Sequence, residues 1–179
     1  MAKQQTQPIN QLDTNVSKWF AVYTHFKREK LVKKMLDQKR IECYLPLRKE
    51  VRNWSKKKRT MELPLISCYI FVKITKAEYV PVLETEYVLN FVKFARDLIA
   101  IPENEIQLLK NILQGEVDFE MMPVSKLQKG DNIIIVGGSL AGTKGQLVDF
   151  EGKKRVIITL GYIQHTFRLT VEKHLIQKV

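Results

Sequence analysis

Apolar positions in the first part of the chain alternate between two periods. Residues 19–23, WFAVY, form a short aromatic and β-branched run that predicts a strand. Between about residues 26 and 38, apolar side chains return at helical spacing, at Leu31, Val32, Met35 and Leu36. Alternation resumes over 41–51 and again over 63–74, which predicts two strands joined by the basic loop 53–60 as an antiparallel hairpin.

The pattern then predicts a short helix over 76–83, a strand over 87–94 and a second long helix over 102–114. Pro102 opens that helix, and acidic residues follow in its first turn. This order of strands and helices is typical of an α+β domain, with helices packed on an antiparallel sheet.

After residue 114 the periodicity disappears, and residues 115–128 are predicted to be a linker. From there to the end the chain holds only short strands and turns, with strands over 132–136, 145–150, 155–160 and 165–170. So many short strands in so short a segment indicate a small closed all-β barrel.

Both faces of the strand predicted over 63–74 are apolar. Ile66, Cys68, Ile70 and Val72 face one way, and Leu65, Tyr69 and Phe71 face the other. Either helices cover both sides of the sheet, or one side is left open for a partner.

The net charge of +11 is concentrated in one region. Residues 27–59 hold 14 Lys or Arg against four acids, including the four successive cations Lys56 to Arg59 at the tip of the predicted hairpin. A concentrated basic region favours a polyanionic partner, most often nucleic acid. A membrane surface fits less well because no long apolar face backs the cations, and a merely solvated basic face is the remaining alternative.

The N-terminal residues 1–17 are polar and are expected to be disordered. They contain no apolar core of a secretory signal, and no apolar run in the chain approaches the roughly 18 residues that span a bilayer. Cys43 and Cys68 form no metal-ligand motif and are interpreted as small core residues in a reducing cytoplasm.

Two parts of the sequence resemble one known family. The segments WFAVYTHFKREK, IECYLPL and LPLISCYIFV, with the basic hairpin between the last two, resemble the N-terminal domain of NusG-type transcription elongation factors. The segment GDNIIIVGGSLAGTKGQLVDFEGKKRVIITLG resembles the KOW motif of the same family. The sequence around CYLPLRKEVRNW resembles the specialised antitermination paralogues, RfaH-like or UpxY-like, more than it resembles the housekeeping factor.

The resemblance implies a domain plan and a function. Residues 18–114 would form the NusG N-terminal (NGN) domain, 115–128 a linker and 129–179 an SH3-like KOW barrel. Members of the family are not enzymes. They bind RNA polymerase at its clamp helices and suppress pausing or termination. A monomer is expected for this protein. The alternative is a KOW-domain RNA-binding or ribosome-associated protein.

The resemblance also implies site residues. By position, an apolar pocket for the clamp helices is lined by Tyr23, Ile66, Tyr69 and Phe71, although each could instead be a core residue under a helix. Trp19 and Phe20 are assigned to the core.

Upstream or non-template DNA would lie beside the hairpin and the first helix. Phosphates are expected on Lys56, Lys57, Lys58 and Arg59. Stacking or polar contacts with bases are expected from His25, Lys27, Arg28 and Trp54, although Trp54 could instead brace the hairpin.

In the barrel, Leu140 and Ile163 are expected to contact a small-subunit ribosomal protein or Rho. Phe167 could join them but is expected to fill the barrel. No catalytic constellation, metal site or cofactor motif is found in the sequence, and a cytoplasmic protein is expected.

Overall fold

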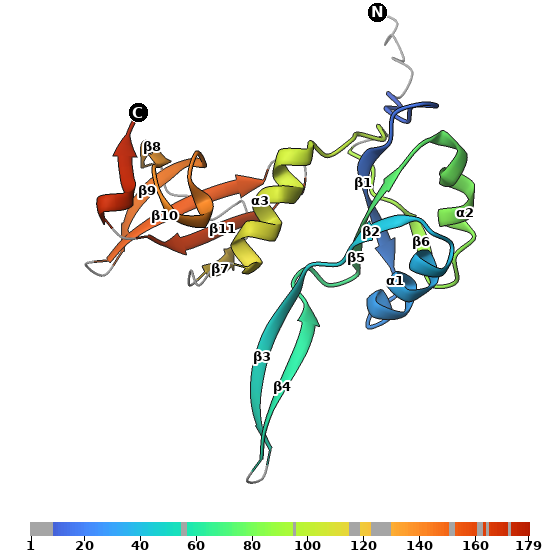
Figure 1. Ribbon diagram of the computed structural model, residues 1–179, viewed down its shortest axis with the longest axis horizontal. Helices are drawn as coiled ribbons and strands as arrows, with labels where there is room; N and C mark the ends of the chain where they lie inside the picture. Colours follow the sequence, from blue (N-terminus) through green and yellow to red (C-terminus); the bar gives the residue numbers. More distant parts are fainter. Residues whose placement is uncertain are drawn as a thin grey trace, which may run out of the picture. The chain divides into compact units, whose positions relative to one another are not determined.

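The computed structural model describes residues 9–54, 57–94, 96–114, 119–122, 130–150, 153–160, 163, 165–171 and 173–179. The chain divides into two compact units, residues 1–103 and 104–179. Figure 1 shows both units.

The first unit is built on a four-stranded antiparallel sheet. Its strands are β1 (Lys18–Thr24), β2 (Glu42–Tyr44), β5 (Tyr69–Ile74) and β6 (Val88–Phe91). They lie in the order β2-β5-β1-β6, so β1 and β5 are central. Together with the helices described next, this sheet confirms the predicted α+β class.

Helices cover one face of this sheet. They are α1 (Glu29–Gln38), the 3₁₀ turn η1 (Lys76–Glu78) and α2 (Tyr79–Leu83). Val32 and Leu36 of α1 and Val82 of α2 are fully buried in the core. The sheet supplies alternate residues to the same core: Phe20, Val22, Ile70, Val72 and Ile74. The intervening residues of β1 and β5 therefore point to the opposite face.

The predicted hairpin is present but is bent away from the sheet. Strands β3 (Leu47–Trp54) and β4 (Lys57–Pro64) pair with each other alone, in a register from Leu47 opposite Pro64 to Trp54 opposite Lys57. Figure 1 shows this two-stranded ribbon extending from the body of the first unit. The continuous strands predicted over 41–51 and 63–74 are therefore wrong at residues 45–46 and 65–68.

Residues 1–17 were expected to form a disordered tail, and within that stretch residues 9–12 make contacts with the first unit. The Gln11 amide donates to the Leu98 carbonyl at 3.0 Å, and the Leu98 amide donates to the Ile9 carbonyl at 2.8 Å. Leu12 packs against the core of the unit. The polar composition of this segment gave no sign of the short pairing. Residues 1–8 lie outside the described ranges.

The helix predicted over 102–114 is present as α3 (Glu103–Gln114). Its apolar residues at helical spacing, Ile106, Leu109 and Ile112, are fully buried. This amphipathic pattern is the reason that the prediction succeeded.

The second unit contains a six-stranded antiparallel sheet in the order β12-β8-β9-β10-β11-β7. The strands are β7 (Phe119–Met122), β8 (Asp131–Ile135), β9 (Lys144–Phe150), β10 (Lys153–Leu160), β11 (His165–Thr170) and β12 (Ile176–Lys178), with 3₁₀ turns η3 (Gly138–Leu140) and η4 (Lys173–Leu175). The predicted all-β class is confirmed. The linker prediction is wrong for 119–122, since β7 pairs with β11.

Gly145 is required by close packing in this sheet. A Cβ atom there would lie 2.7 Å from the Ile157 carbonyl oxygen of the neighbouring strand. Real Cβ atoms do not approach backbone this closely, so a larger residue would push β9 and β10 apart.

Candidate functional site

The sheet face opposite the helices carries a pair of tyrosines. Tyr23 of β1 lies directly across from Tyr69 of β5. Their rings meet edge to face with centroids 4.7 Å apart, and the Tyr69 hydroxyl donates to the Tyr23 hydroxyl at 2.7 Å. Tyr23 is 38% exposed and Tyr69 is half-buried. The two side chains thus present a rigid aromatic surface.

The surroundings of Tyr69 favour the uncharged form of its phenol. Burial, followed by the hydrogen bond with Tyr23, raises the pKa of Tyr69. A neutral phenol costs less to bury in an interface than a phenolate does, which suits the surface to an apolar partner.

Two of the four predicted pocket residues are not at the surface. Phe71 is fully buried on the same face as Tyr69, and it stacks on Tyr44 of β2 with centroids 6.5 Å apart. Burial raises the pKa of that Tyr44 hydroxyl to about 12. Ile66 is 3% exposed and lies in the turn before β5 instead of within a strand. The open pocket expected from these residues is therefore reduced to Tyr23 and Tyr69.

Trp19 and Phe20 were assigned to the core, and both are buried. Phe20 packs under the helices. The Trp19 indole donates to the Glu103 carboxylate at 2.9 Å, and Lys73 forms an ion pair with the same oxygen at 2.9 Å. Sequence reasoning missed this group because its members are far apart in the chain.

A buried carboxylate fixes the turn that precedes Tyr69. Glu29 is 2% exposed, and its Oε1 accepts a hydrogen bond from the Cys68 amide at 2.8 Å. The Cys68 carbonyl accepts one from the Thr24 amide at 2.9 Å. Cys68 has a φ of +65°, which is costly for a residue with a side chain. Both contacts hold this conformation and so set where β5 begins.

The predicted nucleic-acid residues lie in two places. His25, Lys27 and Arg28 are exposed in the turn between β1 and α1. Arg59 is exposed on β4, while Lys56 lies outside the described residues. The backbones of Trp54, Lys57 and Lys58 belong to the ribbon, but their side chains lie outside the description.

The residues predicted to form the barrel's partner surface are buried. Leu140 and Ile163 are each 3% exposed, and Phe167 is fully buried. For Phe167 this confirms the expectation that it fills the barrel, where its ring lies edge-on to Phe119 at 6.1 Å. The prediction that Leu140 and Ile163 are surface contacts is wrong in this structure. Leu140 is buried at the end of the 3₁₀ turn η3, and Gly138 and Gly142, one before it and one after it, take positive φ.

Within the described ranges, no three His, Cys, Asp or Glu side chains are grouped as a metal site requires. The helices in those ranges are each too short or too polar to cross a membrane.

Among the comparisons with known proteins, a family model identifies the family of this chain. The family model described as "Transcription termination factor nusG" matches residues 17–110, more than half of the 179-residue chain. No curated protein sequence matches the chain.

Among solved structures, the chain is similar to the one reported as "Domain interaction in Thermotoga maritima NusG", with a TM-score of 0.55 and 19% identity over 91% of this chain and 97% of that one. A structure of an MjSpt4:Spt5 complex, conformation A, matches 90% of this chain and 97% of its own at 17% identity. Its TM-score of 0.31 is too low to support a likeness. At 19% identity, the Thermotoga maritima structure supports the fold, and the family model supports membership. The protein therefore belongs to the NusG family of transcription factors.

Proposed function

We propose that this protein binds RNA polymerase and favours elongation by suppressing pausing or termination. The observation that carries the proposal is the Tyr23–Tyr69 pair, which lies on the sheet face opposite the helices of a NusG-family domain. The expected partner is the tip of the polymerase clamp helices.

The chemistry of the pair suits a protein interface. Aromatic side chains bury a large area for a small loss of conformational entropy, and tyrosines are common among residues that dominate binding energy. The hydrogen bond between Tyr23 and Tyr69 holds the rings in place before a partner arrives. Phe71 and Ile66 are near Tyr69 in the sequence and are buried. They would support this surface without touching the partner.

The basic segments of the same unit would contact DNA. The exposed cations of the β1–α1 turn and of the ribbon can neutralise phosphates of upstream or non-template DNA. Such contacts add affinity without sequence information. One protein would thereby hold the polymerase and its nucleic acid together.

A specialised antitermination role, RfaH-like or UpxY-like, is the finer form of the proposal. It is supported by the basic ribbon, whose sequence carries the resemblance to those paralogues. If the barrel recruits a small-subunit ribosomal protein or Rho, residues other than Leu140, Ile163 and Phe167 would form the contact, because these three are buried.

The test is the affinity of the full chain for core RNA polymerase, measured by a surface-immobilised binding assay. Changing both tyrosines, Tyr23→Ala and Tyr69→Ala, is expected to weaken binding at least tenfold, because truncating a central aromatic commonly costs about 2 kcal/mol or more. Val80→Ala is the matched control, since Val80 is an exposed apolar residue of α2 on the helix side of the sheet.

Unchanged affinity of the double variant would contradict the proposal. So would a wild-type protein that binds structured RNA but not polymerase, since that outcome fits an RNA-binding or ribosome-associated protein.

A further inference from the structure

A short N-terminal segment pairs with the stretch of chain that runs from β6 to α3. The Leu98 amide donates to the Ile9 carbonyl at 2.8 Å, and the Gln11 amide donates to the Leu98 carbonyl at 3.0 Å. We call residues 9–13 the strap and residues 97–103, which end at the start of α3, the junction.

Side chains of both segments complete this pairing. The Gln11 side-chain oxygen accepts from the Ala100 amide at 2.8 Å, and the Asp97 carboxylate accepts from the Ile9 amide at 2.7 Å. Leu98 is 3% exposed and belongs to the core of the first unit. Its backbone groups and the Ala100 amide therefore depend on the strap for these hydrogen bonds.

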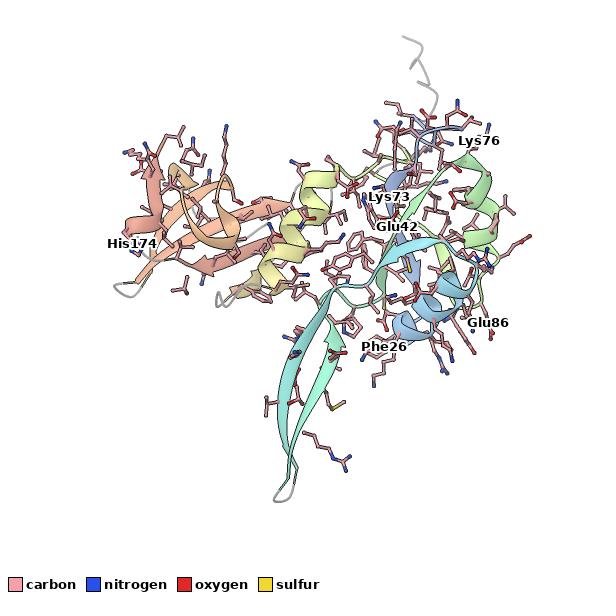
Figure 2. The ribbon with its side chains drawn as sticks, in the orientation of Figure 1. Phe26, Glu42, Lys73, Lys76, Glu86 and His174 are labelled. Carbon is pink, nitrogen blue, oxygen red and sulfur yellow. The ribbon has the colours of Figure 1, made fainter. Side chains whose placement is uncertain are left out.

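The strap is also attached to the core and to η1. The Leu12 side chain packs against the core, and the Asp13 carbonyl accepts from the Lys76 amide at 2.7 Å. The Asp13 carboxylate accepts from the amides of Asn15 and Val16, at 2.8 and 3.0 Å, which stabilises the turn that leads into β1. Figure 2 shows Lys76 at the end of the first unit where the strap lies.

The other end of the junction is held by the sheet. The Ile101 amide donates to the Trp19 carbonyl at 2.8 Å. The Trp19 indole donates to the Glu103 carboxylate at 2.9 Å, and the same oxygen forms an ion pair with Lys73 at 2.9 Å. The strap and the sheet thus hold the two ends of the junction, and together they fix where α3 begins.

The strap is the more exposed of these two attachments. Ile9, Asn10 and Gln11 are exposed, whereas Trp19 is 2% exposed. Segments with few buried apolar contacts and solvent-exposed backbone hydrogen bonds open locally at a low cost in free energy. The strap lies before residues 17–110, the range that the family model matches, so membership of the family does not account for it.

We propose that the strap is a conformational switch that opens while the sheet of the first unit stays folded. When it opens, the backbone groups of Leu98 and Ala100 lose their partners, and the contact between Trp19 and Glu103 at the far end of the junction loosens. The chain passes to the second unit through the junction, so the strap sets the point from which that unit is attached. This inference goes beyond the proposed function, because it requires neither polymerase nor nucleic acid.

Hydrogen exchange of the full chain, followed by NMR, tests whether the strap opens separately. In wild type, the Leu98 and Ala100 amides are expected to exchange at least about tenfold faster than the amides that pair β1 with β5. Gln11→Ala combined with Asp97→Ala removes both side-chain acceptors and should speed exchange of these two amides by a further factor of about ten. The Arg40 amide, bonded at the end of α1, is the internal control and should change less than about twofold.

A second measurement tests whether opening of the strap reaches the start of α3. Trp54→Phe leaves Trp19 as the one tryptophan of the chain. In that background, the double alanine variant should raise the constant for acrylamide quenching of Trp19 fluorescence about twofold, because the indole becomes more accessible. Gln11→Glu with Asp97→Asn keeps both acceptor oxygens and should leave exchange and quenching as in wild type.

The inference is overturned if the Leu98 and Ala100 amides of wild type exchange as slowly as the β1–β5 amides, because the strap would then open only when the unit unfolds. This comparison needs no variant. Unchanged exchange in the double alanine variant also overturns it. So does faster exchange with unchanged quenching of Trp19, since the strap would then fray without loosening the junction. If the double variant does not fold, Gln11→Ala alone is measured in the same way and decides by the same outcomes.

Discussion

At the scale of single residues, Glu29 links two surfaces of the first unit. Its carboxylate stabilises the left-handed conformation of Cys68, and the next residue is Tyr69. The same turn follows strand β4 of the ribbon. One buried side chain therefore positions both the tyrosine surface and the base of the ribbon.

Glu29→Ala should lower the free energy of unfolding by about 1–3 kcal/mol, because the buried Cys68 amide loses its acceptor. Glu29→Gln keeps a carbonyl oxygen at the same place and should cost clearly less. Chemical denaturation of the purified variants measures both values. Equal losses for Ala and Gln would show that the hydrogen bond is not what Glu29 contributes.

The alternation of apolar residues predicted which face of the sheet a side chain lies on better than it predicted whether that side chain is exposed. Alternation in β5 placed Tyr69 and Phe71 on one face, which the structure confirms. The alternation could not predict that Phe71 stacks on Tyr44 of β2 and is buried, whereas Tyr69 is only half-buried. That difference depends on a neighbouring strand, and one strand's sequence does not contain it.

At the scale of elements, the ribbon is a sheet of two strands, β3 and β4, that pair with each other. A two-stranded hairpin is at best marginally stable alone. Its cross-strand pairs include Arg52 opposite Arg59 and Trp54 opposite Lys57. Like charges placed opposite each other destabilise a hairpin, which is consistent with a ribbon that is stabilised when an anionic partner binds.

Replacing Lys57, Lys58 and Arg59 together with Gln should make duplex binding less sensitive to salt. Each lost phosphate contact lowers the slope of log affinity against log salt by about 0.9. Titrations at several salt concentrations measure the slope, and Lys76→Gln serves as the control. If the triple variant keeps the wild-type slope, the ribbon does not contact phosphates.

Element positions were predictable wherever periodicity was strong. Ile106, Leu109 and Ile112 recur at helical spacing, and this pattern predicted α3 correctly. The run of β-branched residues in β10 predicted that strand. Strand interruptions were not predictable, because the left-handed conformation of Cys68 depends on the distant Glu29. The strand β7 was missed because FEMM shows no clear alternation, and its partner β11 lies far along the chain.

At the scale of the whole molecule, the proposed function needs a polymerase-binding surface and nucleic-acid-binding surfaces. Both belong to the unit of residues 1–103. When two contacts are held in one unit, forming the first raises the effective concentration of the second, so modest individual affinities suffice. This linkage is how the protein could change the behaviour of a transcribing polymerase through binding.

The most direct test is a transcription assay in vitro on a template with one defined pause, measuring the pause lifetime with and without the full chain. The account predicts that wild type shortens the pause, that Tyr23→Ala with Tyr69→Ala abolishes the effect, and that Val80→Ala retains it. A pause lifetime that wild type leaves unchanged, or that the tyrosine variant shortens equally well, would contradict the central claim.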